Sequence, residues 1–295
     1  MSISIAIVVL TKDEPEFLDK TIRSIIDRTN YPYELFIVDN NSSLDEQIKL
    51  LNSYEKDGLA HVIFNDKNQW VLGFNKAIEI VNTRVDLSSK YIVLTDGDIV
   101  VPNPVDGVCW LTYLKQKMNG NVTVGKLGLA LDIDFIKNNE RFVDTYASEL
   151  KHVNGPIVDD LVIAPVDTTL AMYRRDLFVM GEFKMLPGHA SLVKPYYYVC
   201  RTTNSVYQAT HLGWNNYVMP KDMDQLRSKV ICFTKYTGYI DPIILDCVDV
   251  KTKYFYKVFR YVIMAYWSFR VFWYWALYIA PRFPRNLNEI QSRRR

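Results

Sequence analysis

The chain has 295 residues, of which 49% are hydrophobic and 23% are charged. This composition is typical of a globular protein with one large domain or two smaller ones, and it excludes a disordered or low-complexity chain. The net charge of only +2 gives no sign of a nucleic-acid partner. The charge is uneven, however, because residues 251–295 carry +9 and residues 1–250 carry −7. An acidic body with a basic, aromatic tail has to be explained by function.

The four cysteines are scattered and form no C-x-x-C pair. We therefore expect reduced thiols in a cytosolic protein, and neither a disulfide framework nor a zinc cluster. The first residues have no basic segment followed by an apolar run, so we expect no signal peptide.

Strands and helices alternate over the first hundred residues. Strands are predicted over residues 3–10, 34–39, 61–65 and 91–95, and helices over residues 14–29 and 71–81. Asp13 and Pro15 are typical of the start of the first helix, and a capping box at residues 43–46 predicts another helix. Short links between alternating elements predict an α/β fold with a mainly parallel sheet and helices on both faces.

The pattern loosens after residue 105. We expect a helix over residues 108–118, a strand over 127–131, and a strand over 167–173 that continues into a helix over 174–180. Short strands are predicted over residues 196–199 and 230–233, with a loop over 187–191. From residue 254 onward the sequence changes to a long aromatic and basic stretch that is compatible with a helix.

Polar side chains follow three of the predicted strands. Ligands of parallel sheets bind beyond the carboxyl ends of the strands, so these side chains are candidates for a site. The three segments are Thr11-Lys12-Asp13, Asp39-Asn40-Asn41 and Asp96-Gly97-Asp98. Two carboxylates on a tight turn suit Mg²⁺ or Mn²⁺ bound together with substrate phosphates. The same spacing also occurs in simple polar turns.

Several segments together carry a family resemblance. They are residues 5–14 (IAIVVLTKDE), 37–42 (IVDNNS), Asn68 with 73–77 (GFNKA), and 91–98 (YIVLTDGD), followed more faintly by 167–175 and 211–214. In this combination the chain resembles the GT-A fold glycosyltransferases of glycosyltransferase family 2. The resemblance implies a nucleotide-sugar-binding half over residues 1–105, an acceptor-binding half of the same domain over 106–240, and a C-terminal tail over 241–295.

The resemblance also implies residues that bind the nucleotide sugar. Thr11 and Asp39 would contact the base with help from Asp13, and Gly73 and Asn75 would approach the ribose and diphosphate. Structural interpretations stay open: an Asx turn for Asp39, close packing for Gly73 and a helix-surface amide for Asn75.

The resemblance gives Asp96 a place facing ribose and metal, and makes Asp98 a ligand of Mn²⁺ or Mg²⁺. His211 would add a late metal or phosphate contact, and a neutral imidazole suits Mn²⁺ better than Mg²⁺. A histidine beside Trp214 also fits a purely structural role.

The catalytic base is harder to place. The family commonly has a Glu-Asp pair before the late histidine, but residues 182–210 contain Glu182 and no aspartate. Asp167 is the leading candidate, because it opens a predicted strand near the expected meeting point of donor and acceptor. Asp222 and Asp224 are the alternatives. Because this Glu-Asp pair is missing, the sequence leaves open whether the transfer inverts or retains the configuration of the sugar.

The tail has fourteen aromatic residues within residues 254–283. Lys253, Lys257 and Arg260 share one helical face, and only Arg270 interrupts the uncharged stretch over residues 261–280. This pattern favours a helix lying in the interface of an anionic membrane over a membrane span or packing against the body.

These observations predict a metal-dependent, inverting glycosyltransferase, peripheral on the cytosolic face of a membrane. It would move a sugar from a nucleotide-diphosphate donor to a lipid-linked or surface-glycan acceptor. One alternative is a catalytically inactive GT-A module that binds a glycan or a partner. The other is a sugar-phosphate nucleotidyltransferase, which would need a glycine-rich loop that residues 11–14 lack.

Overall fold

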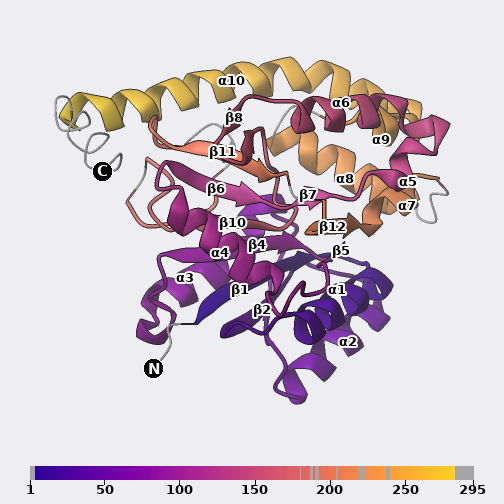
Figure 1. Cartoon of the computed structure of the whole chain (residues 1–295). Coiled ribbons are helices and arrows are strands. Elements are labelled where there is room, and N and C mark those ends of the chain that lie inside the picture. Colours follow the sequence, from indigo (N-terminus) through magenta and orange to yellow (C-terminus); the bar gives the residue numbers. More distant parts are fainter. Residues whose placement is uncertain are drawn as a thin grey trace.

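A computed structural model describes residues 4–179, 181–186, 189, 193–203, 205–218, 223–236 and 240–282, without the side chains of 279–282. Its centre is a nine-stranded sheet of order β3-β2-β1-β4-β10-β6-β11-β9-β8 (Figure 1). The strands, in chain order, are β1 Ile5–Thr11, β2 Tyr33–Asp39, β3 His61–Phe64, β4 Tyr91–Asp96, β6 Val124–Gly128, β8 Ile157–Val158, β9 Leu161–Ile163, β10 Ala171–Arg174 and β11 Tyr198–Thr202.

The first four strands pair in parallel, as the alternation of strands and helices predicts. β10 runs antiparallel to both β4 and β6, and β11 returns parallel to β6. Alternate residues of β1 enter different cores: Ile7 and Val9 pack on one face of the sheet, whereas Ala6 and Val8 pack on the other. A strand buried on both faces explains why its sequence is a continuous apolar run. The fold class predicted from the sequence is confirmed.

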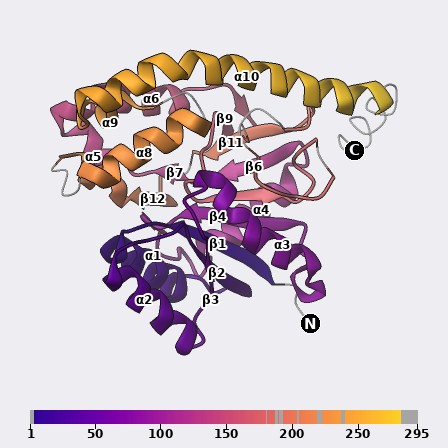
Figure 2. The same ribbon diagram turned by 180° about the vertical axis from the view of Figure 1, so that it is seen from behind.

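Helices cover both faces and one end of the sheet (Figures 1 and 2). The described α-helices are α1 Pro15–Arg28, α2 Asp45–Lys56, α3 Asn75–Thr83, α4 Trp110–Gly120, α5 Asp134–Lys137, α6 Val143–Val153, α7 Asn215–Val218, α8 Met223–Tyr236, α9 Pro242–Asp246 and α10 Val250–Arg282. Pro15 is the first residue of α1, as predicted. The helix predicted over residues 71–81 is two elements, because the 3-10 helix Trp70–Phe74 precedes α3.

The capping predictions are wrong in detail. Leu44 occupies the N-cap position of α2, and its side chain makes no capping hydrogen bond. Asp13 does not cap α1; its Oδ1 instead accepts hydrogen bonds from the backbone N–H groups of Ser43 and Leu44, at 2.6 and 3.0 Å. A carboxylate from a distant loop thus satisfies the start of α2, which no local pattern could reveal.

Three predictions for the second half are also wrong. Residues 230–233 are not a strand but part of α8, where Val230 turns its side chain into a helical core cluster. Residues 175–179 form turns and an isolated bridge in place of the predicted helix, and residue 180 lies outside the described residues. The strand predicted over 127–131 is divided between β6 and β7 Ala130–Leu131.

A small second sheet and the last helix complete the fold. β12 Gln208–His211 lies between β5 Ile99–Val100 and β7. α10 crosses the molecule on the side away from α1 and α2, above α8 (Figures 1 and 2). No helix among the described residues is long and apolar enough to span a membrane.

Candidate active site

A cavity of about 1120 Å³ opens at the carboxyl ends of β1 and β4. Its floor comes from the residues that end these strands, and its other walls come from α6, α8, α9 and α10. Thr11, Asp96, Asp98, Asp167 and His211 all line it. The fold therefore brings together residues that the sequence separates by up to two hundred positions.

Asp96 and Asp98 lie at the turn after β4. Both oxygens of Asp96 accept hydrogen bonds from the Thr168 hydroxyl, at 2.9 and 3.1 Å. Burial, and after it the charges of Asp98 and Asp167, raises the pKa of Asp96 to about 8. Asp98 Oδ1 is buried and has no hydrogen-bond partner among the described residues. Buried polar atoms are normally paired, so this oxygen is available to a ligand.

His211 ends β12 beside Asp98. Its Nδ1 lies 3.9 Å from Asp98 Oδ2 and has no hydrogen-bond partner in the described part of the chain. The ring stacks on Trp214 with centroids 4.9 Å apart, so the predicted structural contact is present as well. A Cβ at residue 213 would collide with the Asp98 carboxylate, which explains the glycine in this turn.

The residues at this turn fit a divalent cation that takes its remaining ligands from substrate. Asp98 and His211 each present an unpaired atom to the same space, and Asp96 adds a second carboxylate. Within the described ranges, no group of three or more His, Cys, Asp or Glu side chains is already arranged as a metal site. Mg²⁺ and Mn²⁺ sites of nucleotide-using enzymes often need only one or two protein carboxylates, since phosphates and water supply the rest.

On the β1 and β2 side, Thr11 lines the cavity and Asp39 lies buried behind it. The Thr11 hydroxyl donates to Glu14 Oε1 and accepts from Gln47 Nε2, both at 3.1 Å. Asp39 Oδ2 accepts from the Ser42 N–H at 2.8 Å, three residues on, so it bonds the following loop but not in the two-residue form of an Asx turn. Asp39 Oδ1, however, is buried without a partner in the described structure, as an acceptor reserved for a base N–H would be.

Asp13, Gly73 and Asn75 do not line this cavity. Asp13 has a left-handed backbone (φ 52°) and holds the start of α2. Gly73 is buried, and a Cβ there would lie 2.8 Å from Asn40 Oδ1, so close packing explains it. Asn75 exchanges two hydrogen bonds with the backbone of Met185, at 3.0 and 2.7 Å. It ties two distant segments together and is not a free surface amide.

Of the two candidate bases that the structure describes, Asp167 and Asp224, the first lines the cavity. Its Oδ1 lies 3.5 Å from Nε2 of the buried His189. Desolvation tends to raise the pKa of Asp167, but His189 and Lys126 outweigh it and lower that pKa, so the carboxylate is ionised. Asp224 is exposed at the start of α8 and pairs with Arg227 at 3.3 Å. Asp222 lies outside the described residues.

Sequence reasoning missed three residues that line the cavity: Glu14, His189 and Lys229. Burial and the charge of Asp98 raise the pKa of Glu14. Lys229 comes from α8 and donates a hydrogen bond to the Tyr217 hydroxyl. Burial tends to lower the pKa of Lys229, but Tyr217 and the carboxylates of Asp98 and Glu14 raise it. Glu14 immediately follows the inspected segment of residues 11–13. No local sequence pattern marks Lys229 or His189 as part of the site.

The sequence profile described as Glycosyl transferase family 2 matches residues 6–179, more than half of the chain. The chain therefore belongs to this family of glycosyltransferases. No curated protein sequence matches it.

Solved structures show a similar arrangement at low identity. The mannosyltransferase PcManGT from Pyrobaculum calidifontis, in complex with GDP-Man and Mn²⁺, is 14% identical over 95% of this chain and 75% of its own, with a TM-score of 0.49. S. aureus TarS is 11% identical over 89% of this chain and 55% of its own, with a TM-score of 0.44. This chain therefore spans about half the length of TarS. GalNAc-T7 with UDP, GalNAc and Mn²⁺ is 13% identical over 71% of this chain and 44% of its own, with a TM-score of 0.47.

Proposed function

We propose that the chain is a metal-dependent glycosyltransferase that moves a sugar from a nucleotide-diphosphate donor to a lipid-linked or surface-glycan acceptor. One observation carries this proposal: Asp98 Oδ1 and His211 Nδ1 are buried without hydrogen-bond partners in the described structure, and the two side chains lie together at the carboxyl end of β4, with His211 Nδ1 3.9 Å from Asp98 Oδ2. Their cavity of about 1120 Å³ is large enough for a nucleotide sugar and part of an acceptor.

The protein's own groups have distinct tasks in this proposal. Asp98 and His211 hold Mn²⁺ or Mg²⁺, and Thr168 fixes the orientation of Asp96 beside them. The bound metal would supply positive charge to the departing diphosphate. Thr11 would face the nucleotide end of the donor, and Asp39, which does not line the cavity, keeps one buried oxygen without a partner in the described structure.

Asp167 is the proposed base. As the acceptor hydroxyl oxygen bonds to the anomeric carbon, its proton passes to an Asp167 oxygen and the bond to the diphosphate breaks. A direct displacement of this kind inverts the anomeric centre. Asp167 is ionised before the reaction, because the neighbouring His189 and Lys126 lower its pKa, and its Oδ1 lies 3.5 Å from His189 Nε2.

α10 supports attachment to the cytosolic face of an anionic membrane. One side of the helix packs on the body through Tyr256, Trp267, Val271, Tyr274 and Tyr278. The other side exposes Tyr254, Tyr261, Phe269, Phe272 and Trp273, each by more than half of its surface. Exposed aromatic rings on a helix that carries basic residues near its start, here Lys251 and Lys257, are typical of a helix at headgroup depth. Because the inner side of α10 packs on the body, a membrane would bind the opposite, outer side of the helix.

The donor site is tested by thermal denaturation with UDP, GDP and dTDP, each with and without Mn²⁺. A ligand that binds only the folded state raises apparent stability, by about 2.7 kcal/mol at one hundred times its Kd. We expect one nucleotide to stabilise the protein strongly only with Mn²⁺, and Asp98→Ala to remove the metal-dependent part. Asp66→Ala, which changes a fully exposed acid outside the cavity, is the matched control.

The same screen separates the alternatives. Absence of any nucleotide or Mn²⁺ effect would favour the inactive module, which the missing Glu-Asp pair motivates. Release of pyrophosphate from a sugar phosphate and a nucleoside triphosphate would indicate a nucleotidyltransferase. That activity is disfavoured because the turn after β1, Thr11 to Glu14, has no glycine to cradle phosphates.

A further inference from the structure

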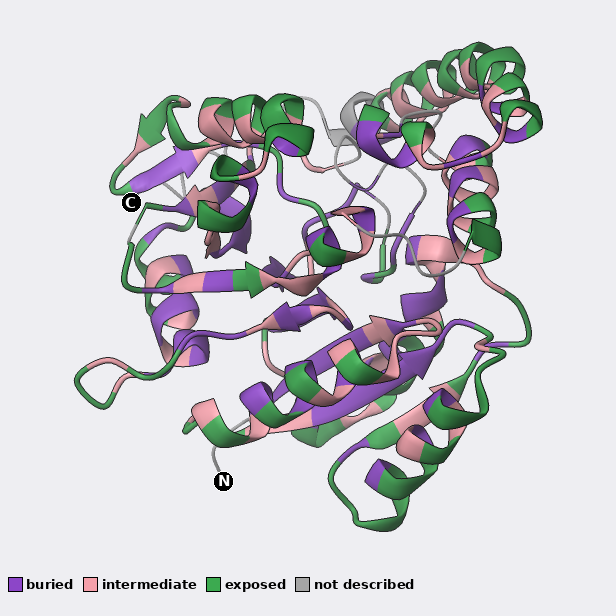
Figure 3. Cartoon of the chain, turned by 90° about the vertical axis from the view of Figure 1, so that its right-hand side faces the viewer, coloured by how far each residue is buried: buried purple, intermediate pink, exposed green. Residues whose placement is uncertain are grey.

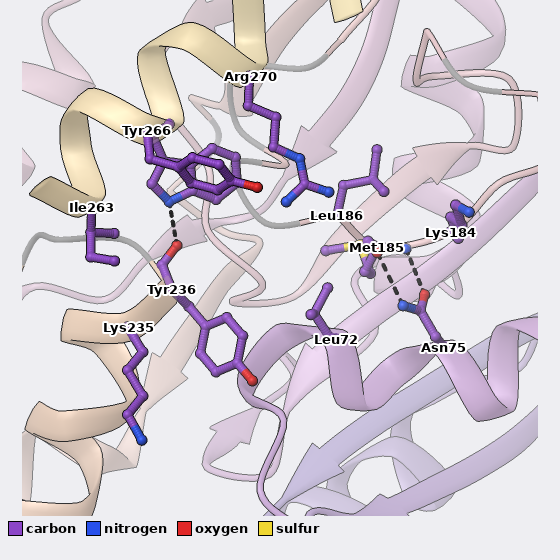
Figure 4. Close-up of a pocket in the computed structure, with 11 residues that line it drawn as sticks. Leu72, Asn75, Lys184, Met185, Leu186, Lys235, Tyr236, Ile263, Tyr266 and Arg270 are labelled. Carbon is purple, nitrogen blue, oxygen red and sulfur yellow. Dashed lines mark hydrogen bonds between the residues drawn. The ribbon is translucent and has the colours of Figure 1, made fainter.

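A second, smaller cavity of about 460 Å³ lies beneath α10 (Figure 4). Its walls come from the 3-10 helix and α3, the segment 184–186, the end of α8 and the middle of α10. Trp267 lines both this cavity and the active-site cavity, so the two cavities share this side chain. None of the residues implied to bind the nucleotide sugar lines it except Asn75.

Arg270 is the charged group at the centre of this cavity. In Figure 4 its guanidinium points from α10 into the space bounded by Tyr266, Leu186 and Leu72. It contacts the rings of Trp267 and Tyr274 at 5.8 and 5.4 Å and donates to the Tyr274 hydroxyl at 3.3 Å. It forms no ion pair with a carboxylate among the described residues, and no acidic residue lines the cavity.

Two more cations lie on opposite sides of the same space, Lys184 and Lys235. Both are exposed, and neither forms an ion pair in the described part of the chain. Three cations around one cavity without an acid repel one another, and an anion would relieve that repulsion. Guanidinium groups in particular match the geometry of phosphate oxygens.

The remaining walls are apolar and firmly held. Leu72, Met185, Leu186 and Ile263 contribute aliphatic surface, beside the rings of Tyr236, Tyr266 and Trp267. Two hydrogen bonds between Asn75 and Met185 fix one wall, and the Trp267 indole N–H donates to the Tyr236 carbonyl across another. The cavity therefore suits an anion that carries an apolar group.

We propose that this cavity binds the phosphate of an amphipathic ligand, with Arg270 as its principal contact and Lys184 and Lys235 at the rim. The exposed aromatic face of α10 lies on the same helix, and the active-site cavity shares Trp267 with this one. A lipid phosphate held here would present its headgroup beside the proposed donor site. Its role as acceptor rests on the proposed glycosyl transfer, whereas its binding does not.

The test measures binding by calorimetry to the full chain, without nucleotide or metal. The probes are farnesyl phosphate, inorganic phosphate and uncharged farnesol. We expect saturable binding of farnesyl phosphate, weakened at least tenfold by Arg270→Gln, since hydrogen bonds to charged groups are worth about 1.5–3 kcal/mol. Arg260→Gln is the matched control, because Arg260 also stacks on two α10 rings but lines neither cavity.

Lys184→Glu gives a second variant at an exposed position, where folding should be unaffected, and we expect it to weaken binding as well. Inorganic phosphate binding as tightly as farnesyl phosphate would support the anion site with a free phosphate as ligand. Equal binding of farnesol, or affinities that Arg270→Gln and Lys184→Glu leave unchanged, would overturn the proposal. Because no donor is present, these outcomes are independent of whether sugar transfer occurs.

Discussion

Asp167 and Asp224 are acids that look alike in sequence, and both side chains are exposed, but of the two Asp167 is the one that lines the cavity. Asp167 lies in the cavity wall beside His189, whereas Asp224 projects from the start of α8 toward solvent. A base must be within reach of the acceptor hydroxyl, and the structure places only the first of these two near such a position.

Asp167→Asn should lower kcat by about 100- to 10,000-fold, the usual contribution of general-base catalysis, with the donor Kd nearly unchanged. Steady-state transfer assays and calorimetry of the donor nucleotide would measure the two effects. Asp224→Asn is the matched control and should retain activity. A loss of activity in Asp224→Asn with none in Asp167→Asn would refute the assignment.

Lys126 is the other unusual titrating group near the site. It is fully buried, donates to the Val166 carbonyl at 2.5 Å and lies over the Tyr173 ring. Burial lowers its pKa to about 7. Between this value and its unfolded pKa of about 10.4, the unfolded chain holds one more proton than the folded chain.

Lys126 should therefore make the free energy of unfolding rise with pH above about 7, by up to about 1.4 kcal/mol per pH unit. Urea unfolding at several pH values between 6.5 and 9.5 would measure this slope. Lys126→Met should remove that contribution, while Lys56→Met, at an exposed position, should keep it. Equal slopes in Lys126→Met and the unchanged protein would show that Lys126 is charged in the fold.

The sequence indicates Asp96 and Asp98 because both acids follow a strand that can be identified from its own residues. Lys229 and His189 could not be found in this way. Each comes from a distant segment, and only tertiary packing brings it to the carboxyl end of β4. Asn75 illustrates the reverse case. Its position in the segment 73–77 predicted a contact with the nucleotide sugar, but its side-chain N and O both form hydrogen bonds with the backbone of Met185.

Among the elements, strands buried on both faces were the easiest to predict. β1, β2 and β4 are short apolar runs with polar ends, a pattern typical of strands buried on both faces. Residues 230–233 are an equally apolar and β-branched run, but they belong to α8. One face of this helix packs in a core cluster, and the other faces solvent. Short apolar runs do not reveal which of the two structures tertiary packing will select.

α10 carries two apolar faces, and the body covers one of them. Figure 3 colours the ribbon by burial, and most of the described α10 residues are exposed or intermediate. The double variant Phe269→Ser, Phe272→Ser changes only rings that are more than half exposed. It should weaken binding to vesicles containing phosphatidylglycerol at least tenfold, because each inserted ring contributes about 1.5–3 kcal/mol. Vesicle co-sedimentation at two salt concentrations would measure this, and added salt should also weaken binding.

Phe135→Ser, at an exposed position on α5, provides the control for loss of a surface aromatic residue. It should bind vesicles as the unchanged protein does. If the α10 variant also binds unchanged, its outer face meets something other than a membrane.

At the scale of the whole molecule, the halves predicted over residues 1–105 and 106–240 share one sheet. β10 joins them, because it pairs with β4 on one side and with β6 on the other. Arg174, at the end of β10, is buried and donates to the carbonyls of Met118, Asn121 and Val124 at 2.7–3.1 Å. A sheet that is continuous across this strand should transmit any local loss of stability to both sides.

We therefore expect one cooperative unfolding transition, with Arg174→Met destabilising both halves together. The variant removes the Arg174 donor from three carbonyls, of which the Asn121 carbonyl still accepts from the Val124 N–H at 3.0 Å. Each unsatisfied group costs about 1–3 kcal/mol, so the free energy of unfolding should fall by about 2 kcal/mol or more. Hydrogen exchange read separately in β1 and β6 would give the opening free energy of each half. Equal decreases in both strands are expected, since β10 is bonded to each half. A decrease confined to β6, or two separate urea transitions, would mean that the halves fold as independent units and that β10 only connects them.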